Sequence, residues 1–187
     1  MKEEKVRYAG MDLLMFGSVG AEGTMAITKE GRSVLEKTLP EDFLDEICEW
    51  HTEAKPECAW EELGATRVWP VGEGGLFAAL WQMALDTGAG FRIDLKQLPM
   101  RQETIEVCEV FDLNPYQLAS AGSYLVVVEN GNEALWLCRK KGIKATLIGK
   151  LSADHDKAIY NEDNIRFLDR PKPDELLRFR ELMKGEE

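Results

Sequence analysis

The sequence has no long hydrophobic run, and this absence argues against a membrane-spanning protein. A transmembrane helix needs about 18 or more consecutive apolar residues, and no such stretch occurs among the 187 residues. The N-terminus is charged and lacks the apolar core of a secretory signal peptide. We therefore expect a soluble, cytoplasmic protein with no membrane partner.

Basic residues are also in short supply. The chain has 23 Lys and Arg against 34 Asp and Glu, which gives a formal net charge of −11. A protein that follows a nucleic-acid backbone needs a basic face that displaces counterions from the phosphates. The one basic run, from Arg139 to Lys141, lies at the end of an expected helix, where it complements the helix dipole. We expect no nucleic-acid partner.

Metal ligands and nucleophiles with a nearby base are scarce as well. The four cysteines form no Cys-x-x-Cys pair, and of the two histidines only His51 lies at helical spacing from a cysteine, Cys48. No second pair completes a zinc site. Ser120 and Ser123 flank a glycine turn with no histidine nearby in the sequence to activate them. We expect no metal site, no catalytic residue and four reduced thiols.

The residues that are present predict an alternation of strands and helices. Apolar runs and period-two patterns predict strands, and apolar residues at helical spacing predict helices. The expected strands lie at 11–16, 66–71, 91–95, 123–129 and 144–151, with an edge hairpin over 158–168; the expected helices start near 25, 40, 75, 105 and 131, and a last one follows Asp174. This pattern predicts one domain over residues 1–187, of the α+β class, with a mixed β-sheet and packed helices.

The segment from Gly75 to Thr87 is the strongest helix signal. Leu76, Ala79, Leu80, Met83 and Ala84 recur at helical spacing on one face, and the opposite face is apolar too. A helix that is hydrophobic nearly all round is buried. We expect this helix to be the structural centre of the domain.

The residues that open this helix, Gly72, Glu73, Gly74 and Gly75, form a candidate anion-binding site. Free backbone N–H groups at a helix N-terminus attract an anion, and glycines permit its close approach. A second interpretation is that the glycines let a buried helix pack tightly on the sheet. The negative charge of Glu73 opposes an anion and favours packing.

Gly17, Gly20 and Gly23 invite a dinucleotide-binding interpretation. Their spacing is Gly-x-x-Gly-x-x-Gly, which differs from the Gly-x-Gly-x-x-Gly fingerprint, and no acidic residue follows at the expected strand end. We therefore expect no dinucleotide site.

Several motifs occur in the order that they have in one known family. They are Gly10–Asp12, Gly17–Thr24, Glu73–Trp81, Leu98–Thr104, Phe111–Tyr116, Ala119–Ser123 and Arg166–Pro171. From about residue 10 to 175, the chain resembles the C-terminal domain of the aminoimidazole-ribonucleotide synthetase and hydrogenase expression/formation (carbamoyl dehydratase) superfamily. The resemblance implies the fold of that domain.

The resemblance also bears on ATP and magnesium. Members of the superfamily use ATP, and their N-terminal half supplies most of the nucleotide and Mg²⁺ ligands. Only about nine residues precede the matching segment here, so we expect a domain that stands without that half. Family members place an Asp and a Thr or Ser just before the paired glycines, at positions that hold Pro70 and Gly72 in this chain. We expect ATP and magnesium only if a separate partner half exists.

The resemblance supports two hypotheses about function. The first is a domain that is non-catalytic alone, a possible pseudoenzyme, and that binds a small ligand or a protein partner. The alternative is one half of a split ATP-dependent enzyme, related to hydrogenase maturation or purine synthesis and completed by a separate ATP-binding subunit. The sequence ends Lys184 to Glu187 without the reactive cysteine of the hydrogenase-maturation enzyme, so we expect no cyanide-ligand chemistry on such a residue. We also expect a homodimer, formed through an apolar patch around Trp50, Trp60 and Trp69.

Overall fold

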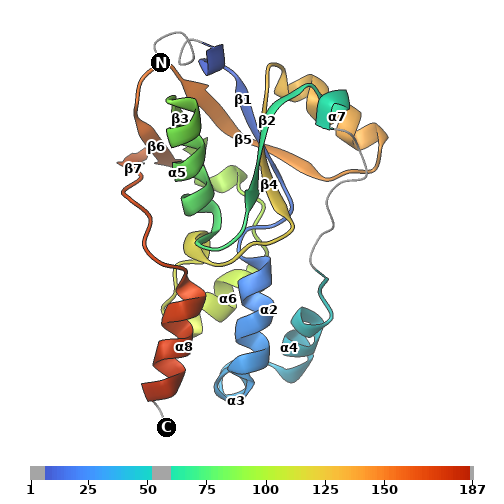
Figure 1. Ribbon diagram of the computed structural model, residues 1–187. Helices are drawn as coiled ribbons and strands as arrows, with labels where there is room; N and C mark the ends of the chain where they lie inside the picture. The colour runs from blue at the N-terminus through green and yellow to red at the C-terminus, as the bar shows by residue number, and fades with distance from the viewer. Residues whose placement is uncertain (1–6, 52–59, 186–187) are drawn as a thin grey trace.

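A computed structural model describes residues 7–51 and 60–185 (Figure 1). The strands of this part of the chain form one sheet in the order β2-β4-β1-β5-β3-β6-β7. They are β1 (Asp12–Phe16), β2 (Ala65–Val71), β3 (Gly90–Asp94), β4 (Ser123–Val128), β5 (Ala145–Ser152), β6 (Lys157–Asn161) and β7 (Asn164–Phe167). The pair β3–β6 is parallel and the other neighbouring pairs are antiparallel, which confirms the expected mixed sheet and the edge hairpin.

The helices cover both faces and one end of this sheet. They are α2 (Ala21–Glu30), α3 (Arg32–Leu35), α4 (Glu41–Cys48), α5 (Gly75–Thr87), α6 (Gln102–Val110), α7 (Gly131–Lys140) and α8 (Glu175–Gly185), with the 3₁₀ turns η1 (Trp60–Leu63), η2 (Leu95–Gln97) and η3 (Pro115–Gln117). The α+β class is confirmed, and α5 has the bounds that its apolar spacing predicts. None of the helices in the described residues is long and apolar enough to cross a membrane.

The alternation of side chains along β1 divides the sheet into two buried faces. Leu13 and Met15 belong to the apolar cluster that contains α5, whereas Leu14 and Phe16 belong to the cluster that contains α7. This division follows from the period of two along a strand. The helices α5 and α7 therefore lie on opposite faces of the sheet.

A third apolar cluster lies among the helices beyond one end of the sheet. Figure 1 shows α2, α4, α6 and α8 together at that end. Their fully buried residues include Ile27, Leu44, Val107 and Phe179. The last helix, α8, is thus anchored against the helices that follow β1, and the chain that leads to it must pass the N-terminus of α5.

Two details of the expected burial are wrong. Leu80 and Met83 of α5 are fully buried, but Leu85 on the same helix is 60% exposed, so α5 is not buried all round. The helix packs on one face of the sheet through the cluster that contains Leu76, Leu80 and Met83. The side chain of Leu85, which lies off this packed face, is therefore exposed to solvent although it is apolar.

The second correction concerns Trp69 of the expected tryptophan patch, whereas Trp50 and Trp60 are half-buried. Trp69 is buried and its indole N–H donates to Asp86 at 2.8 Å. Trp60 meets the ring of Phe16 edge-on, with 5.2 Å between ring centroids, and Trp50 packs against the helical cluster. Tryptophan is large enough to be mostly buried while its N–H keeps a polar partner. The homodimer stays a prediction, without support from these three side chains.

Candidate functional site

The paired glycines at the start of α5 are required by the backbone and by packing. Gly74 and Gly75 have φ values of 75° and 63°, in the left-handed region. A Cβ on Gly75 would lie 2.6 Å from the carbonyl oxygen of Leu118. Only glycine combines this backbone conformation with so close an approach. The packing interpretation of these two glycines is therefore supported by their geometry.

The N-terminus of α5 already has an anionic partner within the chain. One carboxylate oxygen of Asp174, Oδ2, accepts the Gly74 backbone N–H at 2.6 Å. The other, Oδ1, accepts the N–H groups of Leu176 at 2.8 Å and of Ala119 at 3.3 Å. Asp174 is only 4% exposed. A carboxylate is favoured at a helix N-terminus by the dipole and by the unpaired N–H groups there, so Asp174 is an anionic partner for this end of α5 from within the chain.

The other two residues of the candidate site take different roles. The carbonyl oxygen of Gly72 accepts the N–H groups of Gly75 at 3.1 Å and of Ser120 at 3.2 Å. Glu73 is exposed. The four candidate residues thus form one turn, in which Gly74 donates to the Asp174 carboxylate. An external anion at Gly72, Glu73, Gly74 and Gly75 stays a prediction, and it would have to compete with Asp174.

Asp174 is the residue whose role in this site the sequence did not reveal. The sequence indicates it as the N-cap of the last helix, and the hydrogen bond from Leu176 confirms that role. Its bond to Gly74 joins residues 100 positions apart. The available signal was an acidic residue just before α8.

The glycine loop after β1 is a packing element. A Cβ on Gly23 would collide with the Leu118 side chain. The N–H of Gly20 donates to the Ser120 hydroxyl at 2.7 Å, and that hydroxyl in turn donates to the Leu118 carbonyl at 2.8 Å. Ser120 is fully buried in this network. Its hydroxyl holds two loops together and is not presented to a substrate.

The described residues contain no group of three or more His, Cys, Asp or Glu side chains placed to hold a metal ion. Cys48, Cys108 and Cys138 are thiols, and Cys58 lies outside the described residues. Burial raises the pKa of the Cys108 thiol to about 12, with a smaller contribution from the charge of Glu175. Because the thiolate is the reactive form, Cys108 is protected at neutral pH.

We expect thiol titration to show both features. The unfolded, non-reduced protein should react with four equivalents of a disulfide reagent such as dithionitrobenzoate, since no pairing pattern is present. In the folded protein at pH 8, half-buried Cys48 should react well before Cys108. A count of two or none after unfolding would indicate disulfides, and fast reaction of Cys108 would contradict its burial.

Comparisons with known proteins agree with this fold. Residues 9–161 match the family model described as AIR synthase related protein, C-terminal domain. Among curated proteins, the carbamoyl dehydratase HypE of Rhodobacter capsulatus is 35% identical over 86 residues, which cover 44% of this chain and 25% of that protein. Phosphoribosylformylglycinamidine synthase subunit PurL of Methanopyrus kandleri is 29% identical over 98 residues, which cover 51% of this chain and 13% of that protein.

Solved structures show the same architecture. The crystal structure of E. coli HypE superposes with a TM-score of 0.74 at 21% identity, over 94% of this chain and 54% of that one. Thiamine monophosphate kinase from Aquifex aeolicus superposes with a TM-score of 0.56 at 17% identity, over 82% of this chain and 50% of that one. The chain thus spans about half the length of these solved proteins, and it belongs to the AIR synthase related protein family, of which it matches the C-terminal domain.

Proposed function

We propose that this chain, in isolation, binds a small ligand or a protein partner and does not hydrolyse ATP. The observation that supports this most is the Asp174 carboxylate on the Gly74 N–H, at 2.6 Å. A phosphate group approaching this end of α5 would meet a buried negative charge. Electrostatic repulsion and the loss of three hydrogen bonds to Asp174 both oppose such a phosphate.

The residues around this helix do not fit a magnesium–nucleotide complex. Mg²⁺ prefers carboxylate oxygens together with the phosphates of its nucleotide. The positions at which the superfamily places its Asp and Thr hold Pro70 and Gly72, which offer no side-chain oxygen. The Asp174 carboxylate, which contacts this turn, already accepts three backbone N–H groups. We therefore derive no catalytic step through ATP or magnesium for this chain.

The second candidate function is one half of a split ATP-dependent enzyme. It is favoured by how little of each relative is matched: the superposition covers 54% of E. coli HypE, and the 86 aligned residues cover 25% of the Rhodobacter capsulatus HypE. In this alternative a separate ATP-binding subunit would supply the nucleotide ligands and act as the protein partner. Asp174 would then have to leave Gly74, or the nucleotide would have to bind elsewhere.

We expect no Mg²⁺-dependent phosphate release when the purified chain is incubated with ATP. The missing magnesium ligands and the buried Asp174 carboxylate are the physical reasons. The measurement is a phosphate-release assay on protein taken through two orthogonal purification steps, with a magnesium-free reaction as control.

Turnover that follows the protein through both steps and requires Mg²⁺ would contradict the proposal. Turnover that arises only after a separately produced ATP-binding half is added would favour the split-enzyme alternative. Absence of turnover in both reactions would support a binding role.

A further inference from the structure

The strand β7 forms one edge of the sheet and, among the described strands, pairs with β6 alone. The strand at the other edge, β2, is protected: it contains Pro70, and its register with β4 shifts between Ala65 and Arg67. Proline and bulges hinder the pairing of an edge strand with another chain. The strand β7 contains neither a proline nor a register shift, so its free edge can accept a further strand.

Hydrogen bonding to β6 uses every second residue of this edge strand. The Leu168 N–H donates to the Lys157 carbonyl at 2.8 Å, and the antiparallel register places Phe167 opposite Ala158. Residues that bond to a neighbouring antiparallel strand alternate with residues that do not. The N–H and C=O groups of Phe167 and Ile165 therefore point away from β6, toward the free edge.

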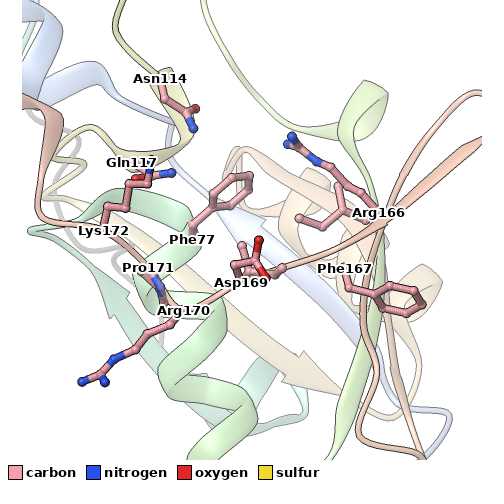
Figure 2. A pocket seen from close by; sticks show the side chains of 11 residues that line it. Phe77, Asn114, Gln117, Arg166, Phe167, Asp169, Arg170, Pro171 and Lys172 are labelled. Carbon is pink, nitrogen blue, oxygen red and sulfur yellow. The ribbon is translucent and has the colours of Figure 1, made fainter.

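The same two residues expose apolar side chains. Ile165 is 55% exposed and Phe167 is 60% exposed. Arg166 between them lies on the α5 side, with its guanidinium carbon 5.6 Å from the Phe77 ring centroid. Figure 2 looks into a cavity of about 320 Å³ beside Phe77 and shows the Phe167 ring turned away from Phe77. By the period of two along a strand, Ile165 and Phe167 share the face of the sheet opposite α5.

The charges around β7 fit a second copy of this chain in antiparallel orientation. The hairpin tip before β7 is acidic, with Glu162 and Asp163, and the segment after it carries Arg170 and Lys172 against one acid, Asp169. A two-fold axis through the middle of β7 places the acidic tip of each copy beside the basic segment of the other. Elsewhere the net charge of −11 makes two copies repel each other, so this edge is a favourable place for them to meet.

We propose that the chain forms a two-fold dimer by antiparallel pairing of β7 with β7 of a second copy. With Arg166 at the axis, Ile165 of each copy faces Phe167 of the other, and the outward N–H and C=O groups of both residues form four hydrogen bonds. Cross-strand pairs of an aromatic and a β-branched residue stabilise such a contact.

Two features keep this dimer weak. The two Arg166 residues face each other across the axis, and like charges directly opposite are unfavourable. One short edge strand also buries less surface than a standard interface does. We therefore expect a dissociation constant on the order of 10–100 µM.

The inference deepens the proposed function, since it rests on a binding role and identifies the protein partner as a second copy of the chain. The strand β7 lies beyond residue 161, where the match to the family model ends. The dimer is therefore assigned to a feature of this chain outside the matched region.

Sedimentation equilibrium of the full chain from about 5 to about 500 µM brackets that dissociation constant. We expect the mass to rise from one chain toward two. Phe167→Lys and Ile165→Lys should each weaken association at least about tenfold, because each puts a charge into both symmetric apolar contacts. Leu182→Lys on α8 is the matched control: Leu182 is 42% exposed, and the variant should change association less than about twofold.

Cross-linking tests the register of the pairing. Arg166→Cys should give a disulfide-linked dimer on mild oxidation, because directly opposed residues that exchange no hydrogen bonds have Cα atoms about 4.5 Å apart, within the span of a disulfide. Asp169→Cys, exposed on the same segment, and the unaltered chain are the controls, and both should cross-link severalfold more slowly, by about fivefold or more.

A mass that stays that of one chain up to about 500 µM would overturn the inference. So would a dimer that Phe167→Lys and Ile165→Lys leave intact, a dimer that Leu182→Lys weakens equally, or equally fast cross-linking of Asp169→Cys and Arg166→Cys. Thermal unfolding of each variant shows whether it is folded, and either lysine variant in β7 serves if the other is not. A monomer would leave the absence of ATP hydrolysis standing, whereas ATP hydrolysis by the chain would contradict the proposed function without dissociating this dimer.

Discussion

Replacing Leu80 by Ala is expected to lower the free energy of unfolding by about 2–5 kcal/mol. Leu80 is fully buried in the apolar cluster between α5 and the sheet. The shorter side chain loses its transfer free energy and leaves a cavity that close-packed neighbours fill only in part. Urea denaturation followed by tryptophan fluorescence measures the change.

Leu85→Ala is the matched control for this variant. Leu85 lies on the same helix and is 60% exposed, so its truncation should change the free energy of unfolding by no more than about 0.5 kcal/mol. Equal effects of the two substitutions would mean that α5 does not pack on the sheet through the face that contains Leu80. An effect of Leu80→Ala below about 1 kcal/mol would contradict its burial.

Asp174→Ala is expected to cost roughly 3 kcal/mol of stability. The carboxylate accepts N–H groups from Gly74, Ala119 and Leu176. Its removal leaves buried donors without partners and removes a favourable charge from the N-termini of α5 and α8. The same denaturation experiment measures the loss.

The control for this variant is Asp169→Ala, on the same segment. Asp169 is exposed, and its truncation should change the stability by about 0.5 kcal/mol or less. The stability loss caused by Asp174→Asn should fall between those of Asp174→Ala and Asp169→Ala, because the amide keeps one acceptor oxygen but loses the charge. A loss for Asp174→Ala no larger than that for Asp169→Ala would show that the carboxylate does not hold α5.

Most of the fold follows from local patterns in the sequence. The bounds of α5 are set by apolar residues at helical spacing between Gly74 and Gly88, both in the left-handed conformation that glycine adopts readily. The strand β4 follows from an unbroken apolar run, as expected for a strand with both faces covered. Such signals depend on residues that are close in the sequence.

The features that the sequence did not predict depend on contacts between distant residues. Nothing near Gly74 indicates that its N–H donates to a carboxylate 100 positions later. Trp69 was expected at a surface patch, but its burial depends on the position of α5, whose Asp86 accepts the indole N–H. The cavity beside Phe77 likewise combines residues from α5, η3 and the segment before α8. These sites arise only when the tertiary structure forms.

We propose that Asp174, and not a nucleotide, is the anionic partner of the N-terminus of α5. The most direct measurement follows the Gly74 amide signal of the ¹⁵N-labelled protein during titration with Mg²⁺ and ATP. We expect that this signal does not shift, because the Gly74 N–H already donates to the Asp174 carboxylate at 2.6 Å. A saturable shift of the Gly74 and Gly75 signals on addition of ATP would contradict it.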